Sequence, residues 1–245
     1  MKLINAIWEK RNLGVDCIEM HCEERDDVAE VLANLPLRAD YQVVRIPTSR
    51  ADLMVAVQDK GYHLIEMQIR LVRCGRDFAL PPLYKRFEPD LSFREATPDE
   101  GEKVAATMET GDIFRTDRIS LDPWFAKGQA GRRYACWTRD LLRNGGRMSL
   151  VSLKGREVGF GVVMAKPDGR YDSCLGGIFS GWENRGMGFI HVFVNTAVPF
   201  KNGARTVVGH VSSNNLPALR LHLAFGYEVQ AMEYVLIRHA TGRPA

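Results

Sequence analysis

The sequence has little cysteine, and its cysteines form no pattern that binds a metal. The 245 residues include five cysteines, an odd and scattered set without a CxxC pair or a Cys/His ligand spacing. These are Cys17, Cys22, Cys74, Cys136 and Cys174. Such usage predicts a reduced, cytoplasmic protein without a structural metal.

Long apolar runs and an excess of one charge are also missing. No stretch approaches the roughly 20 apolar residues that span a bilayer, and residues 1–14 lack the apolar core of a signal peptide. The formal net charge is +3, without a long Lys/Arg run, so we expect neither a nucleic-acid nor a membrane partner. An anionic small ligand is compatible with this balance.

Alternating strand-like and helix-like segments along the chain predict a mixed α/β fold. The pattern predicts strands over 16–23, 41–49, 62–74, 91–97, 171–180, 204–213 and 227–239, and a hairpin over 147–169. It predicts helices over 25–36, 50–61, 98–111, 124–145, 186–203 and 214–226, and a polar loop over 112–123.

A segment with three prolines, residues 75–90, interrupts this alternation and is the best domain boundary. We expect an N-terminal part over 1–78, a linker over 79–90, a larger domain over 91–240 and a tail over 241–245. Strand, helix and strand recur in both parts, and each part has a helix followed by Gly-Tyr and a strand.

The stretch GWENRGMGFIHVF, residues 181–193, places three glycines just before an apolar helix. It fits neither GxxxxGK[ST] nor GxGxxG, because no Lys-Ser/Thr follows and the third glycine is missing. A strand, a glycine-rich loop and a helix start still form an anion site, because the first N–H groups of the helix lack internal acceptors. The alternatives at this point are a plain turn and a phosphate cradle.

A second motif, NNLPALRLHLAFGY, begins at residue 214. Asn215, Ala218 and His222 are spaced i, i+3 and i+7, which places them on one face of a helix. Asn214 or Asn215 can cap that helix, and Pro217 suits its first turn. The starts of this helix and of the glycine-loop helix are expected at one edge of one sheet.

Together the two motifs resemble the GNAT superfamily of acyl-CoA-dependent N-acyltransferases. The resemblance implies a GNAT-like mixed sheet flanked by helices over about residues 91–239, preceded by a partial repeat of the same kind. It implies acetyl-CoA as cosubstrate, with pyrophosphate contacts from the glycine loop and further contacts from the second motif. The positions concerned are Glu183, Asn184, Arg185, Gly186, Met187, Gly188, Phe189, Asn215 and Ala218. Glu183 stands where Gln or Arg is usual.

The resemblance also implies a bulged strand that separates from its neighbour and frees backbone N–H groups. Here that strand is YDSCLGGIFS, where Gly176-Gly177 would permit the distortion, and Ile178, Phe179 and Ser180 would contact the cosubstrate. His222 stands at the family's usual tyrosine acid. It is either a proton donor to the leaving thiol or a histidine that only packs against the helix end.

The acceptor is less defined. The layout resembles the TDP-fucosamine acetyltransferase group, which acetylates a nucleotide-linked 4-amino-4,6-dideoxyhexose. The similar positions are Phe114, Arg115, Asp122, Ala130, Tyr134 and Trp137. Candidates for removing the amine proton are Glu109, Asp112, Asp117 and Asp122, each also explained as a loop charge or, for Asp122 first, a helix cap.

Arg115, Asp117, Arg118 and His210 are candidate substrate contacts, although surface charges and a strand histidine explain them as well. We expect direct acetyl transfer to a small amine, such as a nucleotide-linked amino sugar. The alternatives are an amino acid, polyamine or protein N-terminus as acceptor, or a non-catalytic acyl-CoA-binding module. A homodimer is compatible with the pattern.

Overall fold

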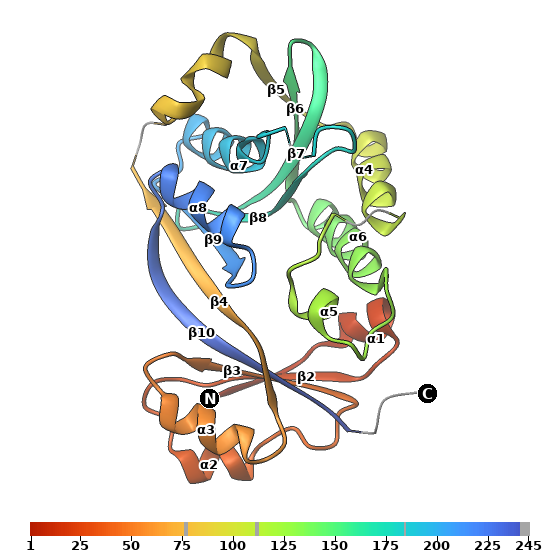
Figure 1. Cartoon of the computed structure of the whole chain (residues 1–245), viewed down its shortest axis with the longest axis vertical. Coiled ribbons are helices and arrows are strands. Elements are labelled where there is room, and N and C mark those ends of the chain that lie inside the picture. The colour runs from red at the N-terminus through yellow and green to blue at the C-terminus, as the bar shows by residue number, and fades with distance from the viewer. Residues whose placement is uncertain (76–77, 111–112, 184, 241–245) are drawn as a thin grey trace.

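One ten-stranded sheet runs through the whole molecule in the computed structural model, which describes residues 1–75, 78–110, 113–183 and 185–240. The strand order is β1-β2-β3-β10-β4-β9-β8-β7-β6-β5, with parallel and antiparallel pairs. Helices flank this mixed sheet on both faces (Figure 1). The predicted mixed α/β class is therefore confirmed. The expected tail over 241–245 lies outside the described residues.

The N-terminal half contains four strands. Its elements are β1 (Lys2–Asn5), α1 (Ile7–Leu13), β2 (Cys17–His21), α2 (Val28–Ala33), β3 (Tyr41–Pro47), α3 (Ala51–Gln58) and β4 (His63–Cys74). The predicted segments from residue 16 to 74 match these elements in type. The sequence pattern did not reveal β1 and α1, which are short and precede the first clear alternation.

The C-terminal half begins with a 3-10 helix in the expected linker. Its elements are η1 (Pro82–Asp90), β5 (Leu91–Glu95), α4 (Pro98–Thr110), α5 (Arg118–Leu121), α6 (Gln129–Arg143), β6 (Arg147–Leu153), β7 (Arg156–Ala165), β8 (Arg170–Ile178), α7 (Phe189–Lys201), β9 (Thr206–Ser212), α8 (Leu216–Ala224) and β10 (Glu228–His239). The helix expected over 124–145 begins only at Gln129, because Gly128 has φ +96°, outside helical geometry.

The two halves exchange their last strands. β4, from the N-terminal half, lies between β9 and β10, and β10 pairs with β3 on its other side. These long strands run side by side through the middle of the molecule (Figure 1). The boundary over 79–90 stays a prediction, but the strands on either side of it complete one another's sheet.

The repeated pattern of a helix, Gly-Tyr and a strand has the same structure in both halves. Gly61 and Gly226 have φ +82° and +77°, the left-handed region that glycine adopts without cost after a helix. The next residues, Tyr62 and Tyr227, are 1% and 3% exposed and anchor the beginnings of β4 and β10. Each half thus has a parallel strand pair followed by a helix, a left-handed glycine and a buried tyrosine.

Helix α7 is the best buried helix of the C-terminal half and fixes the sheet face that carries the site. Its apolar side packs on β7 and β8, and with η1 and β9 forms the largest hydrophobic cluster. Gly161 on β7 permits this close contact, because a Cβ there would lie 2.0 Å from the Asn195 side-chain oxygen. On the opposite face α4 and α6 cover β6, β7 and β8.

Candidate active site

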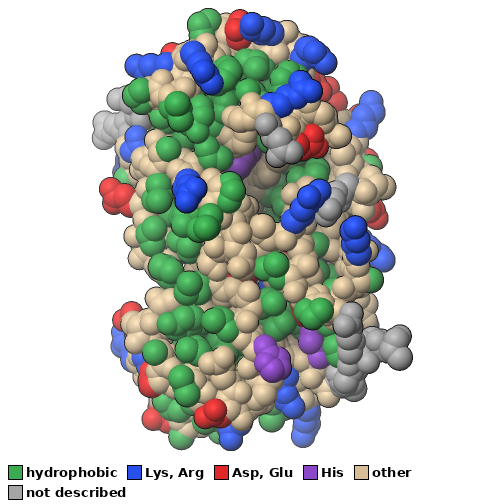
Figure 2. Space-filling view, viewed as in Figure 1, with side chains coloured by type: hydrophobic (Ala, Val, Ile, Leu, Met, Phe, Trp, Pro, Cys, Tyr) green, Lys and Arg blue, Asp and Glu red, His purple; other side chains and the backbone are tan. Residues whose placement is uncertain are grey.

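Strands β8 and β9 are parallel neighbours for only part of their length. They pair from Arg170–Thr206 to Ser173–Gly209. Beyond this point they no longer pair with each other, and each keeps only its other neighbour, β7 for β8 and β4 for β9. A cavity of about 690 Å³ lies where they separate, and residues from both faces of the sheet line it. The molecular surface is hollowed on the face shown in Figure 2. The strand separation that the family resemblance implied is therefore present.

The distortion that opens β8 lies at a different residue from the one expected. The register shift against β7 falls between Ser173 and Leu175, which makes Cys174 the bulged residue. Gly176 and Gly177 remain in the ladder. They are glycines for packing reasons, since a Cβ on Gly176 would lie 2.8 Å from the Cβ of His191 on α7.

On one face of the sheet, α8 brings the second motif to the cavity. Asn215, Ala218 and His222 all line it, so the expectation that they share a helix face is confirmed. Asn215 also caps α8 by accepting a hydrogen bond from the Ala218 N–H at 3.2 Å, as the sequence predicted. Asn215 thus both caps α8 and lines the cavity.

His222 is a buried, neutral histidine. Its Nδ1 lies 2.8 Å from the Ala218 carbonyl oxygen, which only accepts, so Nδ1 carries the ring proton. Burial lowers the pKa of His222, and the Ala218 carbonyl only partly opposes this. The unprotonated Nε2 faces Gly209 on β9, 3.7 Å from where a Cβ would stand. The ring therefore presents an acceptor, not a donor, to the strand opening.

A second histidine, His191, was not among the sequence-predicted site residues. It lies in the first turn of α7, lines the cavity, and its ring centroid is 6.0 Å from that of His222. Burial above all, and His222 beside it, lower the pKa of His191 to about 3. The signal in the sequence was its place three residues after Gly188, but the apolar helix around it suggested only core packing.

The backbone of β8 supplies free N–H groups from alternate residues. Phe179 donates its N–H to the Val158 carbonyl at 2.9 Å, so this N–H is already engaged, and the predicted backbone contact of Phe179 with the cosubstrate stays a prediction. Because N–H groups alternate in direction along a strand, those of Ile178 and Gly176 point toward the side that β9 has left. Gly176, absent from the predicted set, lines the cavity. Ser180 follows the strand and is exposed.

The glycine loop leads into the uncapped start of α7. Gly186 has φ +72°, and Gly188 occupies the N-cap position, where α7 has no side-chain cap. A Cβ on Gly188 would lie 3.3 Å from Leu221, so the start of α7 contacts the second turn of α8. Met187 and Phe189 are buried and anchor the loop, which lies beside the cavity and not among its lining residues.

Charged side chains surround this loop. The Arg185 and Arg156 guanidinium groups lie 5.8 and 5.5 Å from the centre of the Trp182 ring. Glu183 turns back and accepts a hydrogen bond from the Gly181 N–H at 2.6 Å, which braces the loop. Asn184 lies outside the described residues. The loop therefore offers the Arg185 cation, with Arg156 of β7 beside it, at the start of a helix that has no side-chain cap, and the misfitting Glu183 is turned inward.

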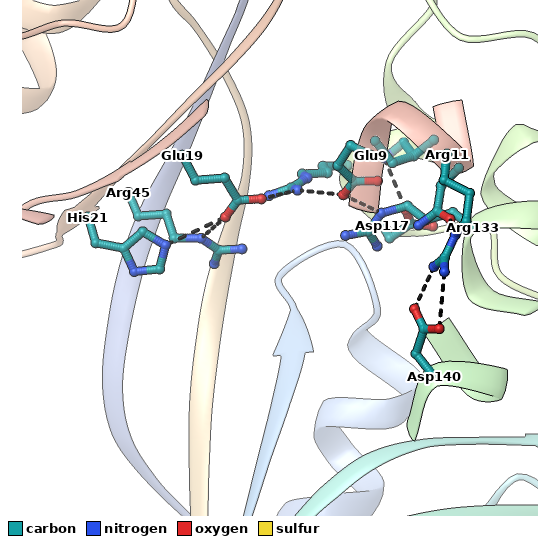
Figure 3. A network of polar contacts seen from close by, with 11 residues as sticks. Glu9, Arg11, Glu19, His21, Arg45, Asp117, Arg133 and Asp140 are labelled. Carbon is teal, nitrogen blue, oxygen red and sulfur yellow. Dashed lines mark hydrogen bonds and ion pairs between the residues drawn. The ribbon is translucent and has the colours of Figure 1, made fainter. Parts of the chain in front are cut away.

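On the opposite face of the sheet, the N-terminal half forms much of the cavity wall. Glu19, Arg45 and Glu66 come from β2, β3 and β4 and line the same cavity as His222. Glu19 pairs with Arg45 at 3.4 Å and more closely with Arg118 of α5, while Glu9 pairs with Arg133 of α6 at 2.8 Å (Figure 3). Burial alone would raise the pKa of Glu19, but Arg118 holds it well below its usual value.

The four candidate substrate contacts have different surroundings. Arg118 is 3% exposed and bound to Glu19 and Glu9, and Asp117 caps α5 by accepting from the Ile119 N–H at 2.9 Å. Both line the cavity, as does His210 on β9, whose pKa burial lowers. Arg115 is exposed and is not a lining residue. Their contact with a substrate stays a prediction.

The other acids proposed as bases are engaged elsewhere. Glu109 forms an exposed ion pair with Arg139 at 3.2 Å. Asp122 has a structural role, accepting from the Trp124 N–H at 2.9 Å and pairing with His239 at 2.8 Å. It does not cap the helix for which the sequence ranked it as a cap, because the N-cap of α6 is Gly128. Asp112 lies outside the described residues.

The described residues contain neither a candidate metal site nor a candidate membrane span. Among them no group of three or more His, Cys, Asp or Glu side chains could hold a metal ion. Across the same ranges, no helix is both long and apolar enough to cross a membrane.

Known proteins resemble the chain at a distance, and no protein-family model matches it. The spore coat polysaccharide biosynthesis protein SpsD of Bacillus subtilis (strain 168) is 25% identical over 201 residues, which are 80% of this chain and 65% of SpsD. The chain thus spans slightly less than two thirds of this curated relative.

Solved structures of GNAT proteins share the fold. A GCN5-related N-acetyltransferase from Sphaerobacter thermophilus matches with a TM-score of 0.57 at 15% identity, over 83% of this chain and 60% of that one. A tandem GNAT protein from the clavulanic acid biosynthesis pathway matches with a TM-score of 0.51 at 13% identity, over 82% and 65%. The chain therefore has the fold of GNAT acetyltransferases.

Proposed function

We propose that the protein is an acetyl-CoA-dependent N-acetyltransferase that transfers an acetyl group directly to a primary amine of a small substrate. The observation that carries this proposal is the opening between β8 and β9, since the cavity there has walls on both faces of the sheet. The lining combines residues of α7 and α8 with residues of α5 and α6, which suits two molecules that meet at the opening from opposite faces.

The residues present fit acetyl-CoA on the α7 and α8 side. The uncapped start of α7, the left-handed Gly186 and the Arg185 charge suit a pyrophosphate. The N–H groups of Ile178 and Gly176 face the opening and suit amide and thioester carbonyl oxygens. When bound, acetyl-CoA supplies a thioester carbon for the amine and a thiol as leaving group.

In this mechanism His222 is an acceptor. Its Nδ1 proton is held by Ala218, so Nε2 is free to accept a proton or an S–H hydrogen bond beside Gly209. The acid role implied by the family resemblance would require protonation of a ring whose pKa is lowered. His222→Phe tests any role in transfer, because an unchanged rate of acetyl transfer would remove His222 from the mechanism.

Direct transfer is favoured over a thioester on the enzyme. Cys174 lines the cavity, but burial raises the pKa of its thiol to about 12 and keeps it protonated at neutral pH. The amine nitrogen therefore forms its bond to the acetyl carbon as the carbon–sulfur bond breaks. Initial-rate kinetics should give intersecting double-reciprocal plots, whereas parallel lines would indicate a covalent intermediate.

A nucleotide-linked amino sugar is the acceptor that we propose. SpsD is named for polysaccharide biosynthesis, and in this chain Phe114 and Tyr134 stack at 3.8 Å in the cavity wall beside Trp137. Flat aromatic faces of this kind suit the apolar face of a sugar ring.

Two measurements test the proposal in order. Isothermal titration with acetyl-CoA should show binding, and its absence from micromolar to millimolar concentration would overturn the proposed function. Thiol release is then measured with TDP-4-amino-4,6-dideoxygalactose, glucosamine, lysine, spermidine and ethanolamine. We expect the fastest turnover with the first, while binding without turnover of any amine would favour an acyl-CoA-binding module.

A further inference from the structure

A carboxylate with one unpartnered oxygen is buried in the wall opposite His222. Glu66 of β4 is 7% exposed, lines the cavity, and its Oε2 has no hydrogen-bond partner among the described residues. It lies on the sheet face of Gln68, which pairs with Ser212 of β9 across the ladder. An unpaired buried carboxylate is costly, so a ligand that satisfies it would be bound favourably.

The nearby cations are paired with carboxylates, although Nε and Nη1 of Arg118 have no hydrogen-bond partner among the described residues. Arg118 is bound to Glu19 and Glu9, and Arg45 binds Glu19 and donates to the Gln68 side-chain oxygen at 2.5 Å.

The lining as a whole carries five carboxylates and three guanidinium groups. Asp140 and Asp172 of this lining are paired with cations outside it, whereas the Glu66 Oε2 has no partner among the described residues. This oxygen thus fits a cationic ligand group such as a primary ammonium.

We propose that the N-terminal half supplies the acceptor side of the active site, and that Glu66 binds the amine and takes its proton during transfer. This inference rests on the proposed function. The ammonium gives one proton to the Glu66 carboxylate, which later returns it to water. The neutral nitrogen then bonds to the acetyl carbon, and its second proton leaves with the sulfur as the thiol.

The surroundings of Glu66 suit this exchange. Burial raises its pKa, while the Ser212 hydroxyl and the Arg118 and Arg45 guanidinium groups lower it and Asp117 raises it. The net rise makes Glu66 a better proton acceptor than an exposed glutamate. Its position on β4, across the opening from α8, separates it from the cosubstrate contacts of α7 and α8.

Glu66→Gln in the full chain tests the inference, with Glu228→Gln on the exposed part of β10 as matched control. All three proteins should bind acetyl-CoA with the same Kd. With the fastest amine of the panel above, Glu66→Gln should lose roughly 100-fold or more of kcat/KM at pH 7, and Glu228→Gln should lose none. The loss should shrink as pH rises toward the solution pKa of the amine, because neutral amine then needs no base.

The outcomes separate the two proposals. If the wild-type chain neither binds acetyl-CoA nor acetylates an amine, the proposed function fails and this inference fails with it. If the wild-type enzyme is active and Glu66→Gln stays within twofold of it, only the inference is overturned. Thermal melting checks folding: replacing an unpaired buried carboxylate by an amide should not lower Tm. A lowered Tm with a pH-independent loss of activity would indicate a structural role and overturn the inference.

Discussion

Breaking the buried network that joins the two halves is predicted to destabilise the fold, and Arg118→Met tests this. Arg118 is 3% exposed, and its partners Glu9 and Glu19 are 0% and 6% exposed. Removing one partner of a buried ion pair costs about 3–5 kcal/mol, because a charge is left without compensation. Here Glu9 keeps Arg133 at 2.8 Å and Glu19 keeps Arg45 at 3.4 Å. We therefore expect Arg118→Met to lower the free energy of unfolding by about 3 kcal/mol, the lower end of this range.

The assay is urea unfolding at pH 7 followed by circular dichroism. Arg147→Met is the matched control, since its pair with Glu95 has side chains 48% and 54% exposed and should contribute under about 1 kcal/mol. Arg118 holds the pKa of Glu19 below its usual value, so the stability from this pair is present above pH 4.5 and is lost as pH falls below it. The difference in free energy of unfolding between wild type and Arg118→Met should therefore narrow below pH 4.5. A loss under 1 kcal/mol at pH 7, or one independent of pH, would refute the reasoning.

Further predictions concern packing, titration, binding and assembly. Gly161→Ala should cost roughly 1–3 kcal/mol in urea unfolding, because its Cβ would meet the Asn195 side chain at 2.0 Å; an unchanged midpoint would contradict this. The pKa of His191 falls from 6.5 to about 3 on folding, so stability should drop by up to about 2 kcal/mol from pH 6.5 to 5, and His191→Asn should lessen the drop. Arg185→Gln should weaken acetyl-CoA binding roughly tenfold by calorimetry, and equal affinity would remove Arg185 from the site. The fragment 79–245 should not fold alone by circular dichroism, whereas a cooperative melt would show an independent domain.

The parts of the site that the sequence predicted are those with local physical signals. Asn215 precedes a helix at a cap position, and the i, i+3, i+7 spacing fixes which side chains share a face whatever the tertiary structure is. The glycine loop is local in the same sense, since Gly186 adopts a left-handed φ within its own turn. Whether a strand N–H is free depends on the neighbouring strand. The Phe179 N–H, for example, is bonded to Val158, and no local sequence pattern predicts this.

The cavity wall that contains Glu66, where we propose that the acceptor amine binds, could not be predicted for a different reason. In β4 apolar side chains such as Ile69 and Leu71 alternate with polar ones such as Glu66 and Gln68, which by itself predicts a strand with one face in water. The structure instead covers the polar face with α5 and α6, brought there by a segment with no clear period. The buried charges therefore looked like surface charges.

The strand exchange connects these observations. β10 has neighbours only from the N-terminal half, β3 and β4, and β4 in turn pairs with β9 on the edge that faces away from the opening. A C-terminal half by itself would leave β10 without a partner and this edge of β9 exposed. The same exchange carries Glu66 to the cavity on β4. The N-terminal half, which has no glycine loop of its own before α2, is thus held in the sheet as the second wall of a single site.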